Sequence, residues 1–134
     1  MAYFETKYSD YFYVIFRAGM GALFLMLGVM KLFGLWGMPG GSAAFGTLAW
    51  YAGAAELLIG LSLVTGVLVR LASAFGIIEM IVAYTIGHAL PNGWNPAVNM
   101  GMPAILFMLA FVVAFAYGAG KASLEQKVFG KELF

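Results

Sequence analysis

Four long apolar runs alternate with short polar segments along the 134 residues of the chain. The runs cover about residues 11–31, 47–69, 71–90 and 102–120. Each approaches the length of about 20 residues that a helix needs to cross a bilayer. Only helices and closed barrels can cross hydrocarbon, and these runs are too long for barrel strands. The pattern therefore predicts an all-α fold, with residues 1–134 forming one domain, a four-transmembrane-helix bundle.

Small residues recur inside these runs, as in the pairs Ala18 and Ala22, or Ser62 and Gly66. Glycine weakens a helix in water, but in a bilayer small residues let helix backbones approach closely. We therefore expect a compact bundle. Small-residue faces that the bundle does not use would leave packing surface for a homo-oligomer.

Basic residues concentrate on one side of the predicted bundle. With four spans, the N-terminal segment, the turn after the second helix and the C-terminal segment share a side. That side holds every lysine and arginine except Lys31, namely Lys7, Arg17, Arg70, Lys121, Lys127 and Lys131. The positive-inside rule predicts a multi-pass protein of the cell membrane with both termini cytoplasmic. No small-residue cleavage site closes the first run, so we expect an uncleaved anchor.

Composition narrows the chemistry. A chain that is 63% hydrophobic and 10% charged is too apolar for a small soluble domain. It has no cysteine and one histidine, which excludes disulfides, iron–sulfur ligation and bis-histidine haem within one chain. We expect no metal site. The net charge of +1 provides no basic surface for nucleic acid, so the expected surroundings are membrane lipids.

Two ionisable residues, Arg17 and Glu79, fall at similar depth in the first and third runs. The rise of an α-helix places them roughly 10 and 13 Å from the predicted cytoplasmic boundary. Buried charges need partners, so the sequence predicts a structural ion pair between them. Two other interpretations stay open: Arg17 could extend to the interface, and Glu79 could be a protonated, hydrogen-bonded acid.

A second group of polar residues belongs to the outer half of the predicted bundle. Glu56 lies there within the second run, Lys31 and His88 lie at the rim, and Asn99 follows on the same side. A carboxylate near an imidazole can transfer protons, and the other side chains can donate hydrogen bonds to a ligand. A structural interpretation remains, in which Glu56 holds the bundle together and Lys31 and His88 are interfacial anchors.

Short motifs follow one another in a fixed order along the chain. These are Arg17, then G-x-x-K-L (Gly28, Lys31, Leu32), E-x-x-x-G (Glu56, Gly60), Gly66, R-x-A (Arg70, Ala72), Ala83 with His88, and G-x-G-x-x-S-L (Gly118, Gly120, Ser123, Leu124). In this order the chain resembles the DoxX family of small four-helix membrane proteins. It departs from that pattern at Ala119, frequently Pro in the family, and at Glu125, usually Asp. Asn99 stands near the place of an acidic residue, and Glu79 is not a family feature.

The resemblance implies relatives of two functional classes, of which the second, among more distant relatives, comprises non-enzymatic chaperones or cargo receptors. The first is the membrane subunit of a quinone-linked oxidoreductase, such as thiosulfate:quinone oxidoreductase. Here Glu56 and His88 would be catalytic, and Lys31, Glu56, His88 and Asn99 would bind a quinone in the outer half of the bundle. A redox partner subunit would supply the electrons, because this chain has no redox group of its own.

Two alternatives remain open. The chain could be a non-catalytic scaffold, chaperone or assembly factor whose buried charges hold the bundle together. It could also be a small proton-coupled transporter or lipid-binding protein in which Glu56 is a titrating membrane carboxylate.

Overall fold

The computed structural model describes residues 8–132, and all regular secondary structure in that range is helical. The helices are α1 (Ser9–Phe33), α2 (Leu48–Thr65), α3 (Val69–Val82), α5 (Met102–Tyr117) and the short α6 (Leu124–Phe129). Helix α3 continues without a break through the π-helical segment η1 (Ala83–Ala89) into α4 (Leu90–Asn92). The predicted all-α fold is confirmed.

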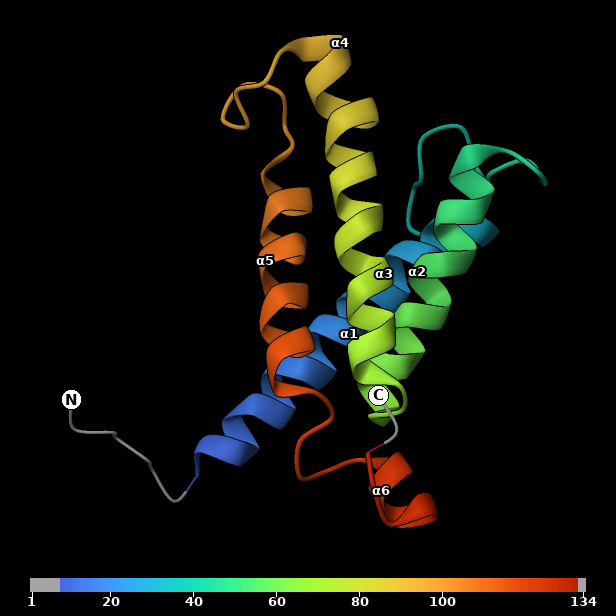
Figure 1. Ribbon diagram of the computed structural model, residues 1–134. Coiled ribbons are helices and arrows are strands. Elements are labelled where there is room, and N and C mark those ends of the chain that lie inside the picture. Colours follow the sequence, from blue (N-terminus) through green and yellow to red (C-terminus); the bar gives the residue numbers. More distant parts are fainter. Residues whose placement is uncertain (1–7, 133–134) are drawn as a thin grey trace.

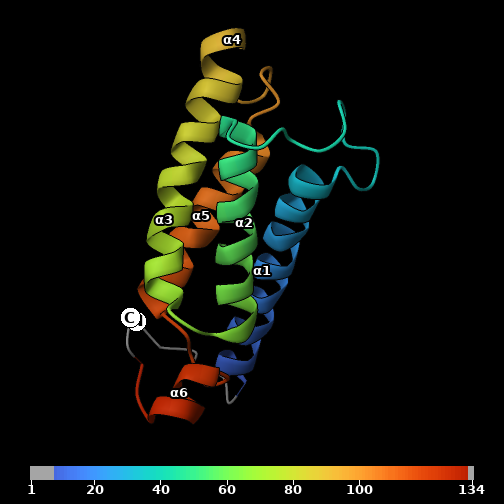
Figure 2. The same cartoon turned by 90° about the vertical axis from the view of Figure 1, so that its right-hand side faces the viewer.

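The long helices run alternately up and down (Figure 1). Helix α1 packs mainly on α2, and α3 packs mainly on α5, whereas the contact between α2 and α3 is less extensive. The start of α1, the turn between α2 and α3, and α6 lie at one end of the bundle, which we call the terminal end (Figures 1 and 2). The loops that follow α1 and α4 lie at the opposite end, which we call the far end.

Three helices are long and apolar enough to cross a membrane: α1, α2 and the continuous stretch Val69–Asn92. The fourth apolar helix, α5, has 16 residues, whose length of about 24 Å is less than the roughly 30 Å of a hydrocarbon core. The sequence placed its end at residue 120, but a glycine at 118 with φ of 70° ends it earlier. The start of α1 and α6 do lie at the same end, as the four-run pattern predicts.

The second helix also ends earlier than predicted. The sequence indicated a helix over residues 47–69, whereas α2 stops at Thr65. Gly66 adopts the left-handed conformation with φ of 74°, and its N–H bonds to the Ser62 carbonyl. This arrangement closes the helix, since glycine takes positive φ without a steric penalty.

Glycines let α1 and α2 approach closely. A Cβ atom added at Gly28 would lie 2.6 Å from the carbonyl oxygen of Gly53 and 2.6 Å from the backbone nitrogen of Leu57. One added at Gly60 would lie 2.6 Å from the backbone nitrogen of Leu25. The predicted packing through small residues is therefore found, and it fixes α1 and α2 as a rigid pair.

The other half of the bundle joins this pair through aromatic packing. Phe24 of α1 and Phe111 of α5 are both fully buried, and their ring centroids lie 4.8 Å apart in an edge-to-face arrangement. Gly76 of α3 provides the space for the Phe111 ring, which a Cβ atom there would meet at 2.6 Å. The core thus lies where α1, α3 and α5 meet and extends to Ile59 and Leu63 of α2. The contact between α2 and α3 is less extensive.

Candidate functional site

A pocket of about 530 Å³ lies between α2 and the α3–η1 helix. Its lining is mostly apolar, and side chains such as Tyr51, Phe75 and Ile78 are more than half exposed at its edge. These residues belong to helices of membrane-spanning length, so the pocket opens sideways, toward lipid. A molecule that enters from the bilayer could reach it without crossing water.

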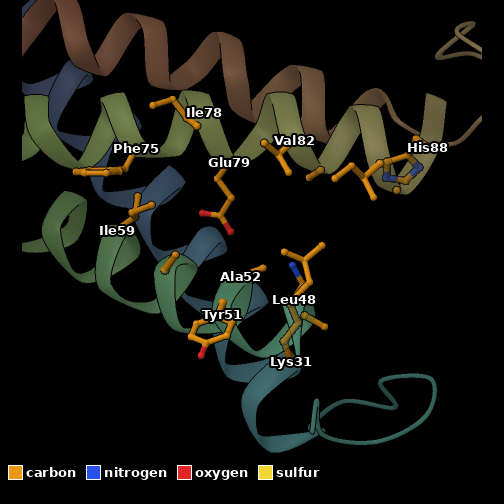
Figure 3. A pocket seen from close by; sticks show the side chains of 15 residues that line it. Lys31, Leu48, Tyr51, Ala52, Ile59, Phe75, Ile78, Glu79, Val82 and His88 are labelled. Atoms are coloured by element: carbon orange, nitrogen blue, oxygen red, sulfur yellow. The ribbon is translucent and has the colours of Figure 1, made fainter. Parts of the chain in front are cut away.

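Polar side chains line the middle and the far end of this pocket (Figure 3). Lys31, Glu79 and His88 all line it, from three different elements (Figure 3). Phe75 and Ile59 lie at the opposite end of the pocket from His88. The pocket is therefore amphipathic along its length.

Lys31 and Glu56 form an ion pair at the base of the pocket. The Lys31 Nζ donates to Glu56 Oε1 at 2.5 Å, and Glu56 is 1% exposed. Glu56 is not part of the lining and reaches the pocket through Lys31. Its second oxygen, Oε2, is buried and has no hydrogen-bond partner among residues 8–132. The pair depends on the close approach of α1 and α2, since Gly53 leaves room for the Lys31 Cβ.

Glu79 extends from α3 across the pocket toward α2 (Figure 3). Both of its carboxylate oxygens are buried, and neither has a hydrogen-bond partner within the described part of the chain. Lys31 and Glu56 are near enough for their charges to act on it. One carboxylate and one ammonium group therefore line the pocket, and a second carboxylate, Glu56, lies behind Lys31; each carboxylate has unused hydrogen-bonding capacity.

The predicted ion pair between Arg17 and Glu79 does not form. Arg17 is 1% exposed, and its guanidinium donates to the backbone carbonyl of Ala119 and, at 2.6 Å, to that of Ala122. Equal depth along two helices does not specify which way the side chains point. Arg17 points toward the C-terminal segment, where carbonyl groups beyond the end of α5 lack helical partners.

Arg17 belongs to a separate cluster at the terminal end. Ser123 donates a hydrogen bond of 2.7 Å to the Gly66 carbonyl, and the Leu68 N–H bonds to Glu125 at 3.4 Å. Arg17, Ser123 and Glu125 are almost completely buried. These contacts fasten the segment before and within α6 to the turn between α2 and α3. Of the motif residues, Arg17, Gly66 and Ser123 thus belong to this structural cluster. Lys31 and His88 line the pocket, and Glu56 contacts it through Lys31.

His88 stands at the far end of the pocket in a fixed orientation. Its Nδ1 lies 2.9 Å from the backbone carbonyl of Asn99. A carbonyl oxygen only accepts hydrogen bonds, so Nδ1 carries a proton, and the tautomer with this proton has its lone pair at Nε2. The second nitrogen is therefore the one available to a ligand.

The π-helical segment explains why Glu79 and His88 share one pocket. They are separated by nine residues, about two and a half turns, which would place them on opposite faces of an α-helix. In η1 the backbone turns more slowly, and the Leu90 N–H bonds to the Thr85 carbonyl, five residues back. The wider turn comes just before Pro91, whose ring would clash with a carbonyl four residues earlier in an α-helix. Single-turn π segments are frequent at functional sites.

Asn99 does not have the ligand-binding place that the sequence suggested. Its side chain is buried within the loop, where Nδ2 donates to the Gly93 carbonyl and to Tyr84, and Oδ1 accepts from the Gly101 N–H. It does not line the pocket. Asn99 instead orders this loop and, through its backbone carbonyl, orients His88.

The fold and the pocket define a small integral membrane protein whose helical bundle has a side opening. The DoxX family model matches residues 12–89, which include the pocket-forming helices α1, α2 and α3. An uncharacterized protein of Haemophilus influenzae is 31% identical over 129 residues, 93% of this chain and 96% of that protein. The chain belongs to the DoxX family, as its motifs predicted. No solved structure matches it.

Sequence reasoning missed the place of Glu79 in the pocket. Its charge drew attention, but its depth along the third run paired it with Arg17 and not with the polar group of the outer half. The signal that could have located it is Pro91 at the end of the third apolar run, since proline after a long helix indicates a local change of helical geometry.

Proposed function

We propose that the chain is the membrane subunit of a quinone-linked oxidoreductase and binds the head of a membrane quinone in the pocket between α2 and α3–η1. One observation carries this proposal: an apolar pocket that opens sideways has Glu79 near its middle and Lys31 and His88 toward its far end (Figure 3). Such pockets, mostly apolar with a few convergent polar groups, are typical of small-molecule sites.

The available hydrogen-bonding groups suit a quinone. A quinone presents two carbonyl acceptors, and its reduced form presents two hydroxyl donors. The Lys31 ammonium has N–H groups beyond the one that it gives to Glu56. Both Glu79 oxygens lack a partner and can accept, and the acid form of the same side chain can donate. His88 Nε2 supplies an acceptor.

Each of these residues has a role in the proposed site. A bound quinone supplies two-electron chemistry, and a partner subunit supplies the electrons, because the chain has no cysteine and no redox motif. Lys31 and Glu79 hold the head of the ligand. The Lys31–Glu56 pair and His88 hold protons near the far end, where the half-buried Lys31 is within reach of the loops and of water.

The main competing ligand is a phospholipid, whose acyl chains would fit the same apolar walls. A structural role also has support, but from the terminal-end cluster rather than from the pocket. Arg17, Ser123 and Glu125 contact backbone groups, and they do not line this pocket. A scaffold would need only that cluster, whereas Glu79 has two unsatisfied carboxylate oxygens at the wall of a pocket, where a ligand can reach them.

The test is to purify the protein in mild detergent and to measure extracted quinone and phospholipid by mass spectrometry. Glu79→Leu and His88→Leu remove the two polar contacts, and Lys121→Ala is the control, since Lys121 is exposed and pairs with Asp10. We expect one quinone per chain in the wild type and the control, and its loss in both pocket variants at unchanged thermal stability. Bulk phospholipid alone in every sample would overturn the proposal.

A further inference from the structure

The pocket continues toward the terminal end as a second hollow between the same two helices. This hollow measures about 390 Å³ and shares three wall residues with the pocket: Ala55, Ile59 and Phe75. The rest of its lining consists of Leu58, Ser62, Leu68, Leu71 and Ala72. Together the two form one groove that follows α3 from His88 to its start.

The two parts of the groove differ in chemistry. All the ionisable residues that line it belong to the far-end part. In the second hollow Ser62 provides the only polar side chain of the lining, and its hydroxyl donates to the Val67 carbonyl. A ligand therefore finds polar partners at one end and only hydrocarbon contacts at the other.

We propose that the second hollow binds the tail of the molecule whose head occupies the pocket, and that the ligand is a long-tailed isoprenoid quinone. This inference rests on the proposed function. It sets the direction of the ligand, with the head near Lys31 and His88 and the tail running toward Leu68. From His88 to Leu68 the groove follows about 30 Å of helix, close to the thickness of the hydrocarbon core. A short-tailed quinone would leave the second hollow to lipid.

A third hollow provides the comparison that makes this proposal specific. It lies between α1 and α5, measures about 380 Å³, and is lined by residues that include Leu106 and Ala110. It has no ionisable lining residue and shares no residue with the pocket. Lipid can fill it as readily as the second hollow, but it is not connected to the site of the head.

The experiment compares two quinones with the same head, one with a long prenyl tail and one with a tail of a single prenyl unit. Their affinities are measured on the purified protein in the same micelles, with the affinity of the micelles for each quinone subtracted. Ala55→Phe narrows the junction of the two hollows, and Ala110→Phe makes the same change in the third hollow. Leu71→Ala and Leu106→Ala form a second matched pair at exposed positions, where folding is least affected.

In the wild type we expect the long-tailed quinone to bind at least about tenfold more tightly, since a few buried CH₂ groups suffice for this ratio. Ala55→Phe and Leu71→Ala should lower this ratio, and Leu71→Ala, which lies outside the pocket for the head, should leave the short-tailed affinity nearly unchanged. Ala110→Phe and Leu106→Ala should leave the ratio as it is. Equal affinities in the wild type, or a ratio that responds only to the changes in the third hollow, would overturn the tail site alone. Failure of both quinones to bind would instead overturn the proposed function.

Discussion

The close approach of α1 and α2 leads to a prediction in which one substitution has opposite effects at two positions of the same helix. At Gly28 an added Cβ would meet the backbone of α2, at the Gly53 oxygen and the Leu57 nitrogen. At Gly19, nine residues earlier on α1, an added Cβ has no neighbour within 4 Å. Gly28→Ala should therefore destabilise the protein, and Gly19→Ala should stabilise it.

The magnitudes follow from these distances. Ordinary van der Waals contact begins near 3.4 Å, so α1 and α2 must separate by roughly 0.8 Å to accept the methyl group at Gly28. Backbone atoms cannot rotate away, and overpacking of this kind costs about 1–3 kcal/mol in the free energy of unfolding. At Gly19 the methyl group only restricts the unfolded chain and raises helix propensity, which contributes about 0.5–1 kcal/mol.

The assay is reversible unfolding in mixed micelles, in which helicity is followed as the fraction of denaturing detergent rises. Both variants carry the same change in composition and hydrophobicity, so each controls for the other. The close-packing explanation is wrong if the two variants shift the midpoint in the same direction. It is also wrong if Gly28→Ala changes the free energy of unfolding by less than about 0.5 kcal/mol, the range of a neutral surface substitution.

Three further predictions concern the buried polar groups. Lys31→Met leaves the Glu56 charge buried without a partner and should lower the free energy of unfolding by about 3–5 kcal/mol. In a double-mutant cycle, the double variant with Glu56→Met should recover most of that loss. Arg17→Met removes two hydrogen bonds from a charged donor and should cost about 3 kcal/mol or more, with protease cleavage within residues 118–132 as a sensitive measure of release of this segment. Ser123→Ala removes the bond to the Gly66 carbonyl and should cost about 1 kcal/mol by the same unfolding assay; a cost above that of Arg17→Met would contradict the assigned contacts.

The helices could be predicted because their apolar runs have the length that a bilayer requires. Their ends were less predictable where tertiary contacts decide them. Helix α2 ends at Gly66, whose carbonyl accepts from Ser123 far along the chain. Helix α6 was missed, although Ser123 and Gln126 have the spacing of a capping box and the Ser123 hydroxyl does accept from the Gln126 N–H.

The candidate site was predicted in part. Depth along the helices correctly brought Lys31 toward Glu56 and placed His88 near the same end, because helical rise depends only on residue number. Depth could not predict which side chains face each other, and so the Arg17–Glu79 pair was wrong. Facing depends on helical rotation, which turns Arg17 toward the C-terminal segment. For His88 the irregular turn in η1 also changes that rotation after residue 83.

The π-helical segment also affects how this site can change during evolution. A π turn differs from an α turn by one inserted residue, and removing that residue would rotate all that follows by about 100°. His88 would then leave the pocket although no pocket residue had been substituted. In relatives that keep both Glu79 and His88 but lack one residue between them, the two side chains would therefore not share a pocket. When sequences are aligned over this segment, the number of residues between the two positions should be compared before the residue identities.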